Sequence, residues 1–503
     1  MSKKTQLKAQ NSSTAFAGPE PDAYDEKLFT NREKEIQLVK RKVDEGRYHQ
    51  PIIQPLVHFW GVMGIGKSWL LQWLFGSYRF TANGQEPGLK LTFATLFDFG
   101  EFVISLWQPS SVVRFLKALI EQIREQIEQD AEIWAFVGPQ LEDFDDNAQD
   151  VLTGKGEVNE LAERFVQIVN RLSQDLVPVL LFDTAEKLDG DVFFWLESHI
   201  LEPILRQDRS VVVIAGRKEI PRWREFGTRQ RLVRKQLQPF DEKETAKMLE
   251  RRGVQVAEDI FFYTFGHPYA IQVLAQATKG QEFVPYLAQV EARFFLGIRP
   301  DQQAILRILS TVRKFNIEST RYLLKKLLGD EYGSWSDVRY LRLLESLEDT
   351  NLVWWETGQR GYVLDYTVRR ILNRHLQLQK PTEFVRRHGI ALELYRRWIR
   401  EYAKGCGPFV REALYHLGQM WLGSADERKQ EYESQANTFL EQVLNDQKIA
   451  TIDEINELWL SLRDDEEIQE TGLRSFYQPI LERIRDLRNA RATAHEEPTK
   501  TAA

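Results

Sequence analysis

The chain has 503 residues, of which 43% are hydrophobic and 28% are charged, and its formal net charge at pH 7 is −7. This composition is ordinary for a globular protein of about three or four domains. The acidic balance argues against a mainly electrostatic binder of nucleic acid or membranes, and no apolar run approaches the roughly 20 residues that cross a membrane.

A single cysteine, Cys406, excludes an intrachain disulfide and predicts a reducing, cytoplasmic location. Its surroundings, KGCGPF, are typical of a loop, where a lone cysteine is expected to be inert. The polar segments 1–24 and 491–503 are predicted to be disordered tails, and the first of them lacks the apolar core of a signal peptide.

Strands and helices are predicted to alternate from residue 25 to residue 238. Short apolar strands are expected at residues 56–60, 89–99, 177–183, 210–216 and 232–238, and amphipathic helices at 111–127 and 159–174. Such alternation predicts an α/β fold in which helices cover both faces of a parallel sheet. The acidic stretches EDFDD (142–146) and RDDEE (463–467) are expected to be solvated loops.

The stretch GVMGIGKS follows the first predicted strand and satisfies the phosphate-binding pattern G-x-x-x-x-G-K-[ST] in full. Gly61, Gly64 and Gly66 let backbone N–H groups turn toward phosphate oxygens without a Cβ in the way. Lys67 is expected to reach the β- and γ-phosphates, and the Ser68 hydroxyl to bind Mg²⁺. The sequence therefore predicts a P-loop NTPase core over residues 25–238.

The helix predicted after this loop, WLLQWLF, begins at Trp69 and points its positive N-terminus at the phosphates. Trp69 is therefore included among the predicted nucleotide-binding residues. The alternative, a glycine-rich turn that binds no nucleotide, is disfavoured because a strand precedes the pattern and a helix follows it.

Three further side chains follow predicted strands and complete the predicted catalytic set with Lys67. Asp183 ends the strand in VLLFDTAEKLD, where a carboxylate can join Ser68 in holding Mg²⁺. Glu186 is predicted to polarise the attacking water, and Arg217, at the end of SVVVIAGR, to sense the γ-phosphate. The alternatives are a loop cap for Asp183 and ordinary surface charges for the other two.

The pattern becomes helical after residue 238. A helical lid is predicted for 239–297, and within it FGHPYAIQVL places Pro268 at a helix start, with His267 expected to be structural or exposed rather than catalytic. Three helices followed by a hairpin with the turn GQRG predict a winged helix over 298–379. A helical domain is expected at 380–490, where the apolar stripe of FVREALYHLGQMWL is expected to be core.

Taken in order, these motifs resemble the STAND class of P-loop ATPases, relatives of the NB-ARC and NACHT modules, over residues 25 to about 378. LFTNREKEIQLV resembles the segment that precedes their P-loop, and FDTAEKL is similar to the D-T-x-E motif of many bacterial members. IAGR matches their sensor arginine, GHP matches their G-x-P motif, and a winged helix follows in the family's order.

This resemblance implies ATP or ADP with Mg²⁺ as cofactors. It also implies that Arg32 lies near the nucleotide, that Arg217 is the sensor arginine and that Pro268 packs near the adenine. The sequence departs from the family where a Met-His-Asp triplet often contacts ADP, because only the aspartate, Asp365, is kept in the corresponding VLD.

The expected function is a molecular switch in which slow ATP hydrolysis controls self-association or the docking of a partner. No effector domain precedes the predicted ATPase, so the effector is expected in trans. One alternative is a DNA-binding ATPase of the origin-recognition kind, although residues 300–380 hold 13 Lys/Arg against 10 Asp/Glu and are only slightly basic. Another is a nucleotide-gated scaffold without meaningful turnover.

Overall fold

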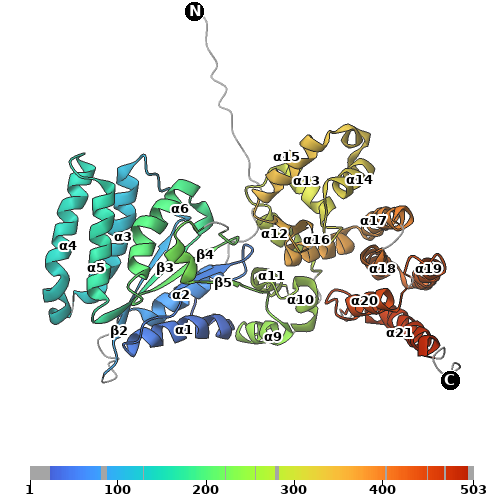
Figure 1. Cartoon of the computed structure of the whole chain (residues 1–503), viewed down its shortest axis with the longest axis horizontal. Coiled ribbons are helices and arrows are strands. Elements are labelled where there is room, and N and C mark those ends of the chain that lie inside the picture. The colour runs from blue at the N-terminus through green and yellow to red at the C-terminus, as the bar shows by residue number, and fades with distance from the viewer. Residues whose placement is uncertain are drawn as a thin grey trace, which may run out of the picture. The chain divides into compact units, whose positions relative to one another are not determined.

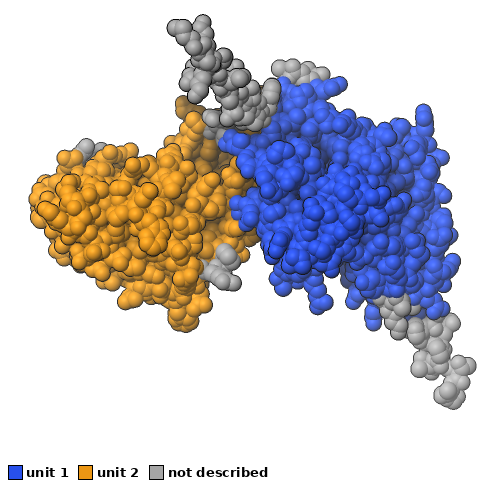
Figure 2. Space-filling model, turned by 90° about the horizontal axis from the view of Figure 1, so that it is seen from above, with its two compact units in different colours: residues 1–18, 280–503 blue, residues 19–279 orange. Residues whose placement is uncertain are grey.

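The structure is a computed structural model that describes residues 23–80, 88–128, 130–220, 223–254, 257–277, 282–358, 360–402, 405–449, 451–469 and 472–496. Most of the predicted N-terminal tail lies outside the described residues. The chain forms two compact units, which Figure 2 shows in different colours: unit 2 holds residues 19–279, and unit 1 holds residues 280–503 with 1–18. None of the described helices is long and apolar enough to cross a membrane.

A five-stranded parallel sheet in the order β2-β3-β4-β1-β5 forms the centre of unit 2. Its strands are β1 (Leu56–Trp60), β2 (Leu91–Asp98), β3 (Leu176–Asp183), β4 (Val211–Gly216) and β5 (Leu232–Gln236). All five coincide closely with predicted strands. β3 and β4 are buried along their whole length, which is why these strands appear in the sequence as unbroken apolar runs.

Helices cover both faces of this sheet (Figure 1). The helices of the core are α1 (Glu33–Arg47), α2 (Lys67–Tyr78), α3 (Pro109–Ile127), α4 (Ala131–Leu152), α5 (Val158–Leu172), α6 (Gly190–Leu196), α7 (Glu202–Leu205) and α8 (Phe226–Gln230). α1 and α2 pack on one face, α3 and α5 pack on the other, and α4 adds an outer layer against α3 and α5. The predicted α/β class is confirmed.

The acidic stretch 142–146 lies inside α4 and not in a loop, so that expectation was wrong. Apolar residues at helical spacing, among them Val137, Leu141 and Phe144, are fully buried against the neighbouring helices. The carboxylates occupy the opposite face, where Asp145 pairs with Arg124 at 2.6 Å. Charge alone suggested a loop, whereas the apolar positions between the charges follow one face of a helix.

Three short helices complete unit 2: α9 (Glu242–Arg251), α10 (Ala257–Thr264) and α11 (Pro268–Leu274). The next helix, α12 (Val284–Phe294), belongs to unit 1 and packs against α16 (Tyr366–Gln379). The boundary between the units therefore falls inside the segment 239–297 that the sequence predicted as one lid.

Unit 1 continues with the three helices and the hairpin that the sequence predicted. These are α13 (Pro300–Leu309), α14 (Ile317–Leu328), the short 3-10 helix η4 (Asp330–Ser334), α15 (Asp337–Glu348), β6 (Val353–Glu356) and β7 (Gly361–Leu364). β6 and β7 pair antiparallel, and a further bridge joins Phe315 to Tyr362.

The remaining helices of unit 1 are α17 (Pro381–Glu401), α18 (Gly407–Leu422), α19 (Asp426–Asn445), α20 (Ile452–Arg463) and α21 (Arg474–Glu496). α18 packs against α17, α19, α20 and α21, and its apolar stripe is core as expected. The lone thiol of Cys406 is buried at the start of α18, and burial raises its pKa. α21 extends into the segment 491–503 that was predicted as a tail.

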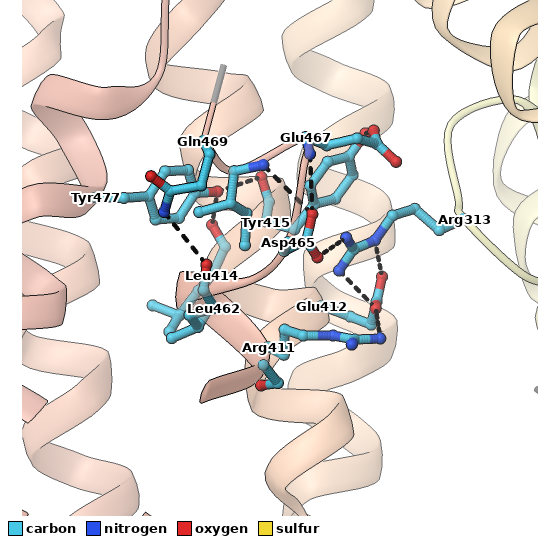
Figure 3. Close-up of polar contacts among 12 residues, drawn as sticks. Arg313, Arg411, Glu412, Leu414, Tyr415, Leu462, Asp465, Glu467, Gln469 and Tyr477 are labelled. Carbon is cyan, nitrogen blue, oxygen red and sulfur yellow. Dashed lines mark hydrogen bonds and ion pairs between the residues drawn. The ribbon is translucent and has the colours of Figure 1, made fainter. Parts of the chain in front are cut away.

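A buried network of charges joins the helix–hairpin segment to the C-terminal helices, as Figure 3 shows. Arg313, just after α13, donates to both carboxylate oxygens of Glu412 on α18 at 2.7 and 2.9 Å, and also pairs with Asp465. Arg369 pairs in the same way with buried Glu467. The stretch 463–467 was expected to be a solvated loop, and this is wrong for Asp465 and Glu467, which supply the partners of these arginines.

Candidate nucleotide-binding site

The P-loop connects β1 to α2 at the carboxyl end of the parallel sheet, where β1 lies between β4 and β5. Gly64 and Gly66 adopt left-handed φ angles of 80° and 97°, which favour glycine. At Gly64 an added Cβ would also lie 2.7 Å from the Cβ of Tyr269. The loop therefore needs glycine here both for its backbone conformation and for the close approach of α11.

Hydrogen bonds fix the carbonyl side of this loop. The Lys67 ammonium donates to the carbonyl oxygens of Gly61 at 2.7 Å and Val62 at 3.0 Å. The next three carbonyls, at residues 63–65, accept from groups far away in the sequence. Five consecutive carbonyl oxygens are thus held by the protein.

Those three distant donors come from α11 and from the segment before α1. His267 bonds the Met63 carbonyl through Nε2 at 3.0 Å, and the Tyr269 amide donates to the Gly64 carbonyl at 3.2 Å. The Arg32 guanidinium donates to the carbonyl of Ile65 at 2.6 Å.

The amide side of the loop is available for an anion. Within the described residues, the N–H groups of Met63, Gly64 and Gly66 donate to no protein acceptor. An added Cβ at Gly66 would have only the Arg32 guanidinium nearby, at 4.0 Å. A row of free amides at the start of α2, beside the Lys67 ammonium, fits the phosphates of a nucleotide.

His267 is structural, as expected, but its role in the site was not predicted. It is fully buried, and its Nδ1 accepts from the Ala270 amide at the start of α11, so Nε2 carries the proton that bonds Met63. Burial lowers the pKa of His267 to about 3, and the imidazole is therefore neutral at physiological pH. The sequence pattern G-H-P marked the helix start but gave no sign of this contact.

Arg32, which the resemblance predicted near the nucleotide, lies against the P-loop. Arg32 has a left-handed φ of 67°, and the residue before it has one of 65°. Its guanidinium bonds the Gln238 carbonyl at 2.7 Å and lies 4.7 Å from the centre of the Phe240 ring. Burial lowers the pKa of Arg32 to about 10, so the side chain remains cationic at neutral pH.

Ser68 and Asp183 lie together, as the predicted Mg²⁺ site requires. Asp183 ends β3, is 4% exposed, and forms a hydrogen bond with the Ser68 side chain. Burial raises its pKa, although the Ser68 bond opposes this, and the nearby Asp98 adds to the rise. These hard oxygen donors fit Mg²⁺, which is held in proteins by few side chains together with phosphates and water.

Among the described residues, no group of three or more His, Cys, Asp or Glu side chains is arranged to hold a metal by itself. Asp98 is directly opposite Asp183 in the register of β2 and β3, so both carboxylates lie at the same sheet edge. Asp98 was not among the predicted site residues, although it ends β2 as Asp183 ends β3.

Glu186 and Arg217 form an ion pair with each other. The Arg217 Nε lies 3.0 Å from Glu186 Oε1, and the Arg217 amide donates to Oε2 at 3.0 Å. An Arg217 Nη also contacts the Met63 sulfur at 3.4 Å. The structure therefore brings both predicted residues to the P-loop, and the charge of one orients the other.

Trp69 and Pro268 lie at the first turns of α2 and α11, respectively. The Trp69 ring is partly exposed and contacts Tyr24 edge to face at 5.6 Å. Pro268 is buried at the position where a helix tolerates a missing N–H. Nothing in these contacts assigns either residue to a nucleotide base, so both remain predictions.

No protein-family model and no curated protein sequence matches this chain. Among solved structures, it is similar to the Walker-type ATPase paby2304 of Pyrococcus abyssi at 15% identity and a TM-score of 0.45, with 71% of this chain and 99% of that chain covered. It is also similar to the STAND protein PH0952 of Pyrococcus horikoshii, which has a tetratricopeptide repeat sensor (15% identity, TM-score 0.33, 94% and 67% covered). A third similar structure is Cdc6p of Pyrobaculum aerophilum, at 12% identity and a TM-score of 0.31, with 72% of this chain and 97% of that chain covered. Likenesses this distant do not assign the chain to a family.

Proposed function

We propose that this protein is an ATP-binding switch of the STAND type, in which slow hydrolysis controls self-association or the docking of a partner supplied in trans. The observation that carries the proposal is that two segments from elsewhere in the chain bond directly to the P-loop backbone. α11 bonds it through His267 and Tyr269, and the segment before α1 bonds it through Arg32.

These contacts link occupancy of the site to the arrangement of the lid. A phosphate that shifts the loop backbone also changes the geometry of the three carbonyl bonds, and so favours one position of α11 over another. A ligand shifts such an equilibrium only by its differential affinity for the two states, and a few kcal/mol is enough. The short helices α9 to α11 are the element that this proposal expects to move.

ATP with Mg²⁺ would supply the transferable phosphoryl group and most of the local charge. Lys67 would hold the phosphates, and Ser68 with Asp183 would hold the metal. Glu186 would orient water, but its ion pair with Arg217 must loosen for its carboxylate to act on a water molecule. This requirement favours slow turnover.

The exposed face of α15 favours a protein partner over DNA. In a winged helix the third helix enters the major groove with polar and basic side chains. Here Val338 is 60% exposed and Leu341 is 43% exposed, and Trp355 on the hairpin is 48% exposed. Arg339 lies over the Trp335 ring at 3.7 Å and is partly engaged in the protein. The DNA-binding ATPase therefore remains the less supported alternative.

Light scattering with ATP, a non-hydrolysable analogue or ADP, with Mg²⁺ present, tests the switch. We expect a larger mass, or binding of a partner protein, with ATP and the analogue but not with ADP. Lys67→Ala is the control, because it removes the ammonium that holds the phosphates while leaving the buried core intact. The same mass and the same partner binding in all three nucleotide states would contradict the switch and leave a simple ATPase or an ungated scaffold.

A further inference from the structure

A groove of about 470 Å³ lies between α17 and α19 in unit 1. Both helices pack against α18, which holds them apart and leaves the space between them. The size falls within the usual range for small-molecule sites. The floor of the groove is apolar and includes Ile399, Phe439 and Val443.

Two arginines on the α17 side pair with no carboxylate in the described part of the chain. Arg396 and Arg400 are one helical turn apart and so lie on the same face of α17. Neither forms an ion pair or a side-chain hydrogen bond with any described residue. The Arg396 guanidinium lies 5.4 Å from the centre of the Phe439 ring. Burial, together with the charge of Arg400, lowers the pKa of Arg396.

A third cation stands at one end of the groove. The Lys448 ammonium donates to the carbonyl oxygens of Tyr402 at 2.8 Å and Arg400 at 3.3 Å, at the end of α17. These bonds fix its position without neutralising its charge. Among the described residues that line the groove, Asp446 is the only carboxylate, so three cations face one anion.

The α19 side offers uncharged hydrogen-bonding groups. Ser434, Thr438 and Gln442 are spaced four residues apart and therefore form one stripe along α19. Charged side chains are common elsewhere on this helix. Hydroxyls and an amide that face two arginines suit a ligand with hydroxyl or phosphate oxygens along its length.

The other arginines of α17 pair with carboxylates of described residues, which sets Arg396 and Arg400 apart. Arg387 bonds Glu383 at 2.8 Å, and Arg397 pairs with Glu318. On α21, Arg483 pairs with Glu441 of α19. Two like charges one turn apart also weaken a helix slightly when nothing neutralises them. An anionic ligand would remove this repulsion.

We propose that the groove between α17 and α19 binds a small phosphorylated compound that carries at least two negative charges. Arg396 and Arg400 would bind its phosphate oxygens, Lys448 would add the third positive charge, and the Ser434–Gln442 stripe would bind its uncharged part. The proposal goes beyond the switch described above, because it uses no residue of the P-loop and lies wholly in unit 1. α17 begins directly after α16 ends, so the ligand would bind a helix that continues from the helix–hairpin segment.

Calorimetry with inorganic pyrophosphate and with 5′-AMP tests this site in the Lys67→Ala protein, in which the P-loop is disabled. Changing Arg396→Gln together with Arg400→Gln should weaken binding of the better probe about ten-fold or more, because hydrogen bonds to charged groups are lost. Arg428→Gln, elsewhere on α19, should leave the affinity unchanged. Thr438→Val is a second variant, which keeps both arginines. It should weaken the binding of 5′-AMP more than the binding of pyrophosphate.

Unchanged affinity in the double variant, or no binding of either probe at millimolar concentration, would overturn the proposal. A 12-nucleotide single-stranded RNA or DNA that binds more tightly than both probes, and loses that binding in the double variant, would assign the groove to nucleic acid instead. Because the P-loop is disabled throughout, each result stands whether or not the switch itself is correct.

Discussion

Single side chains control the nucleotide site through the backbone of the P-loop. Lys67, His267 and Arg32 come from three parts of the chain, yet each donates to a carbonyl of the same short loop. By holding the carbonyls they leave the amides to face a phosphate. A change at any of these residues is therefore expected to alter nucleotide affinity, even where the side chain does not contact the nucleotide.

The ion pair between Glu186 and Arg217 makes a prediction about hydrolysis. Glu186→Gln should leave ATP affinity unchanged and slow phosphate release by about 100-fold, the usual size of a general-base contribution. Arg217→Ala should also slow release, because it removes the cation expected at the γ-phosphate. Single-turnover phosphate release measures both. Wild-type rates in Glu186→Gln would make this carboxylate a purely structural partner of Arg217.

The neutral state of His267 makes a prediction about pH. Burial lowers its folded pKa from the ordinary 6.5 to about 3, so between these values the unfolded chain binds a proton that the folded chain does not. Stability contributed by this group is therefore complete above pH 6.5 and is lost as the pH falls toward 3. Between pH 7.5 and 5.5 the loss is about 1.4 kcal/mol for this one residue.

His267→Asn is the matched variant, because asparagine also caps a helix but is too short to replace the bond to Met63. Urea unfolding at pH 7.5 and 5.5 measures the free energy of unfolding of both proteins. The drop between the two pH values should be smaller in the variant by about 1.4 kcal/mol. His58, the other buried histidine of unit 2, has a similarly lowered pKa. Its contribution to the pH dependence is the same in both proteins, so it cancels when the variant is compared with the wild type. An unchanged pH dependence would show that His267 is charged or solvated in the folded protein.

At the scale of elements, the C-terminal helices are joined to the helix–hairpin segment by buried charge as well as by apolar packing. Burial opposes the charge of Glu412, but the guanidiniums of Arg313 and Arg411 more than offset this, so its pKa lies below the ordinary value. Such a network gives little net stability compared with apolar packing, yet it is costly to break on one side. It therefore fixes which elements pair.

Arg313→Met tests this network, because it leaves Asp465 buried without its cation. We expect the free energy of unfolding of unit 1 to fall by about 3–5 kcal/mol. Neutralising the partners as well, in Arg313→Met/Glu412→Gln/Asp465→Asn, should recover a large part of that loss. Chemical denaturation measures the free energy of unfolding of the wild type, the single variant and the triple variant. Arg463→Gln changes an exposed arginine and serves as the control, which should not change stability. Equal losses in the single and triple variants would mean that packing of the arginine stem matters, not its charge.

At the scale of the whole molecule, the chain has two units with separate cores. The core of unit 2 surrounds the parallel sheet, and that of unit 1 surrounds α18 and the helices packed on it. All residues of the nucleotide site belong to unit 2, and the α17–α19 groove belongs to unit 1. The two ligands are therefore expected to stabilise different parts of the chain.

Differential scanning calorimetry should show two unfolding transitions. ATP with Mg²⁺ should raise the transition temperature of only one of them. At a nucleotide concentration 100 times the dissociation constant, the gain is about 2.7 kcal/mol for the unit that binds it. Lys67→Ala should abolish this shift without removing either transition. A single transition that moves as a whole would show that the units unfold together.

The sequence by itself determined the parts of this protein that depend on local pattern. The P-loop, the five strands, the hairpin and the positions of Asp183 and Ser68 all follow from short-range rules, because glycine conformations, apolar periodicity and strand ends are encoded by neighbouring residues. The same rules failed for the acidic stretches 142–146 in α4 and 463–467. Both were predicted as solvated loops from their charge, although buried positions lie within them.

Only the tertiary structure decided which distant side chains meet. His267 and Arg32 are separated from the P-loop by 204 and 33 residues at their contacts, and no local pattern specifies such pairings. The same holds for the pairing of Glu186 with Arg217, and for Arg396 and Arg400 of the α17–α19 groove, which pair with no carboxylate of the described residues. A charge is satisfied or unsatisfied according to what the folded chain brings within a few ångströms of it, which depends on the packing of whole elements.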